Sequence, residues 1–156
     1  MTDPLKTVAD VKERIDGNRF AMITSIDERG TLSSRPVTVQ RLDDDGDLWF
    51  LVDRSAEWVA PLDGGPVNAA VADDRTWVSF AGRAVLVTDQ SVIDELSDPM
   101  SETFFEEGAE PVALRVVADR VEWWTSPNKA VQLIELAKAK LSDSQPDLGD
   151  SGAIEL

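Results

Sequence analysis

Two absences limit the chemistry that the side chains of this chain can perform: its 156 residues include no histidine and no cysteine. This composition excludes disulfides, thiolate zinc sites, haem held by an axial histidine, and serine or cysteine nucleophiles activated by histidine. Carboxylates remain as metal ligands, but the acidic run DDDGD (residues 43–47) is too short for a calcium loop. It predicts a solvated hairpin turn, so we assign neither a catalytic side chain nor a metal site.

Arg35 is the cation with the most unusual setting, because Pro36 follows it inside a run of strand-forming residues. Proline removes one donor from a strand ladder and therefore indicates an edge, a bulge or a split between sheets. The simplest role for Arg35 is an exposed ion pair with a carboxylate such as Asp47 or Glu57, which would contribute little to stability.

The charge of the chain restricts its partners. The formal net charge is −15 and the sequence pI is about 4.2, so the surface field repels nucleic acid and anionic membranes. A ligand that carries phosphate would need a local arginine to overcome this field. The first residues lack the cationic and apolar pattern of a targeting signal, and no apolar run approaches a membrane span. We therefore expect a cytoplasmic protein that binds neither nucleic acid nor membrane.

The segment that must position these residues is 20–53, which predicts a three-stranded antiparallel meander with turns at DERG (27–30) and DDDGD (43–47). Neither face of its first strand is uniformly polar, so the sheet must be covered on both faces, by closing into a barrel or by packing on a partner. Further strands are expected at 67–72 and 76–88, and the segment 112–125 predicts two strands broken at 118–120.

Apolar spacing and caps predict helices at 5–15, from Ser55 to Leu62, at 89–98 and at 129–141. Residues 104–108 (FFEEG) predict a loop held by a buried aromatic anchor. The chain is expected to divide into a domain at 1–141 and a polar tail at 142–156, which could dock again through Ile154 and Leu156. The fold class is mainly β (α+β): a six-stranded antiparallel split β-barrel with Greek-key topology and short peripheral helices.

A set of short motifs occurs in order along residues 5–140: AMITS (21–25), SSRPV (33–37), DLWF (47–50), WVSFAG (77–82), FFEEG (104–108), PVALRV (111–116) and VEWW (121–124). Each motif is weak, but their ordered set resembles the FMN-binding split-barrel proteins of the pyridoxamine 5′-phosphate oxidase superfamily, within it the bacterial general stress protein branch. The resemblance implies a homodimer in which each FMN lies in a groove between the two barrels.

The resemblance also implies roles for individual residues. Arg35, which Pro36 follows, would bind the ribityl phosphate, and Ser55 would reach the same group. The remaining residues would surround the isoalloxazine ring: Val37 and Thr38 along its edge, Leu51 and Val52 on its other face, and Trp124 of the partner subunit as a cover. Taken singly, Trp49, Trp77, Trp123 and Trp124 equally suit a core or a dimer interface.

Three positions depart from the pattern of the family. Gln40 and Trp58 stand where members commonly have lysine, and Val52 stands where a threonine often ends the third strand. The basic motif that closes the substrate site of true pyridoxamine phosphate oxidases is also missing. Because each charged hydrogen bond contributes about 1.5–3 kcal/mol, losing two cations should weaken phosphate binding unless Arg41 or Arg54 replaces them.

Two functions follow from these expectations. The first is an FMN-dependent oxidoreductase in which reduced flavin passes a hydride or electrons to a small-molecule acceptor, which requires no side-chain acid or base. The alternative is a non-catalytic split-barrel dimer with a degenerate flavin site that acts in binding or in the stress response. The deazaflavin cofactor F420 is a third option, although its acidic tail suits so negative a chain poorly.

Overall fold

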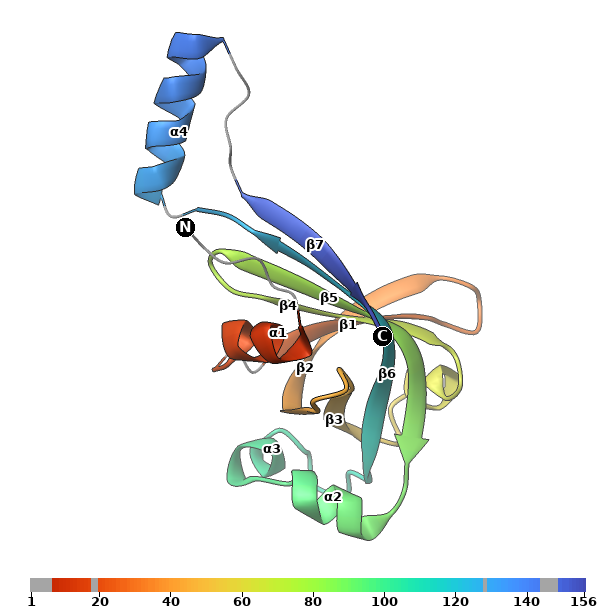
Figure 1. Cartoon of the computed structure of the whole chain (residues 1–156). Coiled ribbons are helices and arrows are strands. Elements are labelled where there is room, and N and C mark those ends of the chain that lie inside the picture. Colours follow the sequence, from red (N-terminus) through yellow and green to blue (C-terminus); the bar gives the residue numbers. More distant parts are fainter. Residues whose placement is uncertain (1–6, 18–19, 128, 144–148) are drawn as a thin grey trace.

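The computed structural model describes residues 7–17, 20–127, 129–143 and 149–156. Its strands form one antiparallel sheet in the order β3-β2-β1-β4-β5-β6-β7, and β3 also pairs with β6, so the first six strands close into a barrel (Figure 1). The strands are β1 (Phe20–Ile26), β2 (Leu32–Leu42), β3 (Leu48–Asp53), β4 (Pro66–Ala72), β5 (Thr76–Val87), β6 (Pro111–Thr125) and β7 (Asp150–Glu155). Because β4 returns to lie beside β1, the first four strands have the Greek-key order, as predicted.

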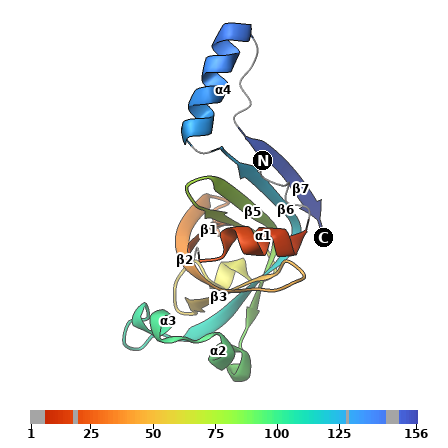
Figure 2. The same ribbon diagram turned by 60° about the vertical axis from the view of Figure 1, so that its left-hand side comes forward.

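The helices are short and lie outside the barrel. They are α1 (Val8–Ile15), the 3₁₀ turn η1 (Ala60–Leu62), α2 (Gln90–Leu96), α3 (Pro99–Thr103) and α4 (Lys129–Ser142). In both views α3 and α4 lie at opposite ends of the molecule, and α4 projects beyond the ends of β6 and β7 (Figures 1 and 2). The predicted helix at 5–15 begins with a capping box formed by Thr7 and Asp10, and Leu5 lies outside the described residues.

The barrel interior is filled by one face of each strand. Phe50, Phe80, Ile23 and Leu114 are fully buried there. β3 is buried on both faces, because Trp49 and Leu51 pack outside the barrel against Ile93 and Leu96 of α2. The expectation that both faces of the sheet need a cover is therefore confirmed for β3.

On the opposite face of β1 and its neighbours, several apolar side chains are exposed among the described residues. Ala21, Ile23 and Ser25 point inward, whereas Met22 on the other side is 44% exposed. Trp77 of β5 and Trp124 of β6 are register partners, and each is also 44% exposed. We call this surface, built on Met22, Trp77 and Trp124, the outer face.

β6 is one continuous strand and not the two strands predicted for 112–125. Gly82 pairs with Ala118 and Ala81 pairs with Arg120, so Asp119 is an extra residue, a β-bulge that the sequence suggested as a break. A Cβ at Gly82 would lie 1.9 Å from the carbonyl oxygen of Val117, which explains the glycine at this close approach.

Three further predictions need correction. Residues after Ser55 form turns and the short η1, because Ser55 bonds back to Asp53 and does not cap a helix. Residues 99–103, which were not expected to be helical, form α3 behind the cap of Asp98. The end of the chain is not only a polar tail, because β7 pairs with β6. Ile154 packs against the core, in agreement with the prediction that the tail could dock through this residue.

Candidate functional site

A cavity of about 460 Å³ lies between β2, β3 and α3. The cavity exists because β2 changes its partner strand. Residues of β2 up to Thr38 pair with β1, and Val39, Arg41 and Leu42 pair with β3, with an irregular step between Val39 and Arg41. Pro36 lies in the first part, where its missing amide hydrogen costs no bond to a second strand. Of the three features that Pro36 suggested, the structure has an irregular step at Val39–Arg41, a few residues further along β2 and next to the cavity.

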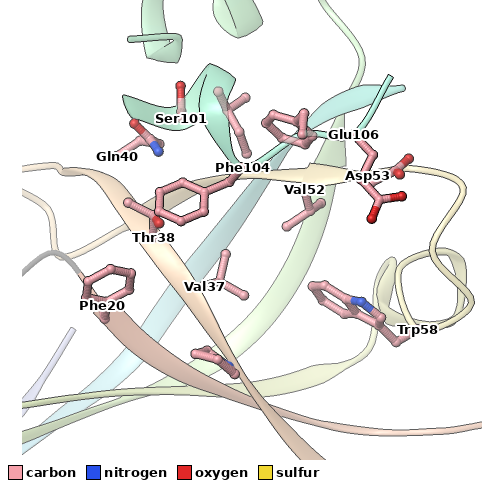
Figure 3. Close-up of a pocket in the computed structure, with 13 residues that line it drawn as sticks. Phe20, Val37, Thr38, Gln40, Val52, Asp53, Trp58, Ser101, Phe104 and Glu106 are labelled. Carbon is pink, nitrogen blue, oxygen red and sulfur yellow. The ribbon is translucent and has the colours of Figure 1, made fainter. Parts of the chain in front are cut away.

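The walls of the cavity are mostly apolar, with polar groups at two places (Figure 3). Thr38 and Gln40 of β2 lie near Ser101 and Phe104 from the α3 side, and Asp53 and Glu106 lie together at the opposite upper corner. The lining comprises Phe20, Pro36, Val37, Thr38, Gln40, Leu51, Val52, Asp53, Trp58, Ser101, Phe104, Phe105 and Glu106. No lysine or arginine is among these described lining residues.

Seven of the ten predicted cofactor residues lie in this lining: Pro36, Val37, Thr38, Gln40, Leu51, Val52 and Trp58. Arg35, Ser55 and Trp124 lie outside it. Six of the seven lie on β2 and β3, and Trp58 comes from the turn that follows β3.

Arg35 lies behind Trp58, with its guanidinium 4.5 Å from the centre of the indole ring. It donates hydrogen bonds to Ser25 Oγ at 2.8 Å and to Ser33 Oγ. Partial burial lowers the pKa of Arg35 from its ordinary value, without removing its charge. Arg35 thus contacts the wall of the cavity through the Trp58 ring.

The suggested ion pairs of Arg35 are absent from the described part of the chain. Asp47 is instead buried and accepts hydrogen bonds from Arg115 Nε at 2.7 Å and from the Ala118 amide at 3.2 Å. Arg41, a suggested replacement for the missing lysines, pairs with Asp43 at 2.7 Å, so it does not approach the cavity.

Ser55 contacts the rim of the cavity and not its interior. Its hydroxyl donates to Asp53 Oδ1 at 2.7 Å, its amide to the same oxygen at 2.9 Å, and the Glu110 amide approaches that oxygen at 3.2 Å. These donors lower the pKa of Asp53, with the Ser55 hydroxyl as the largest cause. Asp53 therefore stays ionised at the cavity rim.

The sequence did not predict the α3 wall. Residues 104–108 were expected to form a buried anchor, but only Phe105 is partly buried, against Leu51 and its neighbours. Phe104 is 62% exposed and lines the cavity. The adjacent phenylalanines at 104 and 105, shortly before β6, indicated that an aromatic ring packs here. They did not indicate which of the two rings would pack inward.

The cavity suits the flat ring of a flavin better than the phosphate end of FMN. Val37, Leu51, Val52 and Trp58 offer apolar walls, and Thr38 and Gln40 offer side-chain donors for ring heteroatoms. Asp53 and Glu106 would repel a phosphate, whereas the guanidinium of Arg35 lies 4.5 Å from the ring of the lining residue Trp58. Among the described residues no cluster of three acidic, histidine or cysteine groups could hold a metal ion.

The structure is thus a closed six-stranded Greek-key barrel with a cavity between β2, β3 and α3, and the comparisons with known proteins place this barrel in a family. The chain belongs to the pyridoxamine 5′-phosphate oxidase-like family, whose model matches residues 6–147. None of the curated proteins matches the sequence. Among the described residues, no helix has the length and apolar character to cross a membrane.

Solved structures from bacteria have the same fold. A protein assigned as general stress protein 26 from Jannaschia sp. CCS1 aligns with a TM-score of 0.71 and 25% identity, over 96% of this chain and 100% of its own. The general stress FMN/FAD binding protein of Xanthomonas citri aligns with a TM-score of 0.60 and 25% identity, over 71% and 82% of the two chains. A relative of general stress protein 26 from Clostridium acetobutylicum, 12% identical, has a TM-score of 0.69 and covers 95% and 93%.

Proposed function

We propose that this protein binds FMN in the cavity between β2, β3 and α3 and acts as a flavin-dependent oxidoreductase on a small-molecule acceptor. The observation that supports this most is the cavity itself: its apolar walls lie at the split of the barrel, in a chain of this family. The similarity to a structure described as an FMN/FAD binding protein adds support.

When bound, the flavin would supply the redox chemistry, so the protein has only to bind, orient and exclude water. Val37, Leu51 and Val52 would hold the ring edge against β2 and β3. Thr38 and Gln40 would orient it by hydrogen bonds. Arg35, next to Trp58, would bind the phosphate at the end of the cavity where Trp58 lies.

We further propose that the protein is a homodimer built on the outer face. The register brings Thr38 opposite Phe20 at one end of a row across the sheet, and Trp77 opposite Trp124 at the other, with β4 between. A two-fold axis in the plane of this face, parallel to the strands, would exchange the two ends. The partner's Trp124 would then lie beside the mouth of the cavity, near Thr38.

The test of this function is a fluorescence titration of the protein with FMN and with riboflavin, which has the ring but no phosphate. We expect quenching with a dissociation constant in the micromolar range for FMN. Arg35→Gln should weaken FMN binding about tenfold or more and leave riboflavin unchanged, because one charged hydrogen bond contributes about 1.5–3 kcal/mol. Absence of quenching by both flavins would refute the proposal, and equal losses for both would place the phosphate elsewhere. F420 serves as a third ligand in the same titration.

A second function is favoured by one observation, the two carboxylates in a lining without lysine or arginine. In this alternative the flavin site is degenerate and the dimer is a non-catalytic binding protein. Replacing Gln40→Lys together with Trp58→Lys distinguishes the two. A large gain in FMN affinity favours the degenerate site, whereas unchanged micromolar binding favours the oxidoreductase.

A further inference from the structure

Helix α4 has the reverse of the usual arrangement of an amphipathic helix. Leu133, Ile134, Leu136 and Leu141 share one broad stripe at helical spacing, and they are 68%, 54%, 47% and 90% exposed. The better shielded residues lie on the opposite side: Gln132, Glu135 and Ala139 are partly buried. Gln132 also donates to Ser126 Oγ at 2.6 Å and to the Pro127 carbonyl at 2.9 Å. The helix therefore turns its polar side to its own chain and its apolar stripe outward.

An exposed stripe of this size indicates a docking surface. Both views show α4 beyond the ends of β6 and β7, away from the barrel (Figures 1 and 2). Its own barrel cannot cover the stripe without breaking the hydrogen bonds of Gln132.

A second surface with exposed apolar side chains lies on α3, at the other end of the molecule. Met100 is 46% exposed and Phe104 is 62% exposed, and Phe104 lines the cavity from this side. Glu102 of α3 and Glu107, which follows it in the chain, are also exposed. α3 therefore offers an apolar centre with an acidic rim.

The charges of the two surfaces are complementary. Lys140 lies within the apolar stripe of α4, at helical spacing from Leu136. Lys138 lies at the margin of the stripe, where its ammonium group is exposed and 3.6 Å from Glu135 of the same helix. Opposite charges around an apolar contact give orientation and specificity. In a chain of net charge −15, Lys140 and Lys138 give the apolar stripe of α4 a positive charge that suits the acidic rim of α3.

We propose that α4 of one protomer docks on α3 of a second copy and forms the outer wall of its flavin cavity. This inference rests on the proposed dimer. In the chain, α4 follows Trp124, which lies at one end of the outer face, and α3 lies at the other end. The proposed two-fold axis exchanges these ends, so it places α4 of one protomer next to α3 of the other. The partner's α4 would cover Phe104 and so complete the cavity.

Cross-linking tests this contact, because the chain has no cysteine of its own. The double variant Met100→Cys, Leu136→Cys places one thiol on each surface, and both sites are exposed, so folding should be unaffected. Since α3 and α4 lie at opposite ends of one protomer, a short bismaleimide can join the two thiols only between protomers. We expect a covalent dimer on a denaturing gel. The matched control is Glu28→Cys with Leu136→Cys, whose first site is in the exposed turn between β1 and β2.

The oligomeric state of the same samples separates the possible failures. A dimer by light scattering that cross-links no faster than the control overturns the docking of α4 and leaves the proposed dimer intact. A monomer overturns both. As a second readout, Leu136→Asp should speed FMN release by about tenfold, because it removes apolar cover from the cavity wall. Unchanged release from a dimer that still binds FMN would contradict the proposal.

Discussion

At the scale of single residues, Asp47 shows how an acidic turn can stabilise the barrel. Its carboxylate is 4% exposed and holds Arg115 of β6, whose guanidinium also lies 5.4 Å from the centre of the Trp49 ring. The sequence predicted a solvated turn at 43–47, and the turn is correct, with Gly46 at a φ of 97°. What the sequence could not reveal is that its last residue, directly before β3, is buried against β6.

The Asp47–Arg115 pair gives an asymmetric prediction. Arg115→Met should lower the free energy of unfolding by about 3 kcal/mol, because it leaves a buried carboxylate without its cation. Asp47→Asn should cost less, since the partly exposed guanidinium of Arg115 can turn to water and the amide can still accept from Ala118. Urea denaturation of both single variants and the double variant measures this. Equal losses in the two single variants would contradict the asymmetry.

Asp53 gives a prediction about pH. Its pKa lies below its ordinary value of 3.8 in the folded protein, chiefly because the Ser55 hydroxyl donates to it. Because the pKa of Asp53 is lower in the folded than in the unfolded protein, its ionised form stabilises the fold at every pH above the ordinary pKa of about 3.8. This stability is lost as the pH falls from about 3.8 through the lower pKa of the folded state. Ser55→Ala should raise the pKa of Asp53 and reduce its contribution to stability above that pH. Carboxyl titration by NMR tests this, and an unchanged pKa would show that the backbone donors suffice.

Seven of the ten cofactor residues that the resemblance to the family implied line the cavity, because the motifs that carry the resemblance lie mainly on β2 and β3. Asp53 and Phe104 were missed because their positions depend on contacts between distant segments. Asp53 accepts a hydrogen bond from the Glu110 amide at the cavity rim. Phe104 lines the cavity because α3 precedes it, and no strong helical periodicity in the sequence predicts α3.

At the scale of elements, strands were predicted better than their breaks and ends. The bulge at Asp119 is a tertiary feature, since its carbonyl accepts the Leu156 amide at 2.9 Å, at the end of β7. β7 itself has little apolar alternation and forms because β6 extends beyond the barrel and offers it a free edge. Local propensity cannot reveal an edge that another segment creates.

Gly152 is the residue on which the docking of β7 depends most. An added Cβ would lie 2.6 Å from the Trp123 ring, which β7 covers. We expect Gly152→Val to loosen β7 while the closed barrel stays folded, with faster amide hydrogen exchange at Ile154 and Leu156. Ser151→Val, at an exposed neighbouring position, is the control. Exchange rates equal to those of the control would show that the indole can move aside.

At the scale of the whole molecule, the outer face decides whether the protein acts as two copies. Trp77→Glu should weaken the proposed dimer by roughly 100-fold, because two charges would be buried near the interface. Flavin binding should weaken with it, since each cavity would lose its partner. Light scattering and FMN titration measure both effects, and Trp77→Phe is the control that keeps an aromatic ring. A Trp77→Glu protein that remains dimeric would place the interface elsewhere.

The pairing of Thr125 with Asp150 has a consequence for how such a chain can diversify. The two residues are neighbours across the strands, so everything between them is an insertion whose entry and exit already lie side by side. A tight turn could replace residues 126–149 without altering a rung of the ladder. Insertion, deletion or exchange of that segment would leave the fold of the barrel unchanged, so this segment can vary in evolution without loss of the barrel.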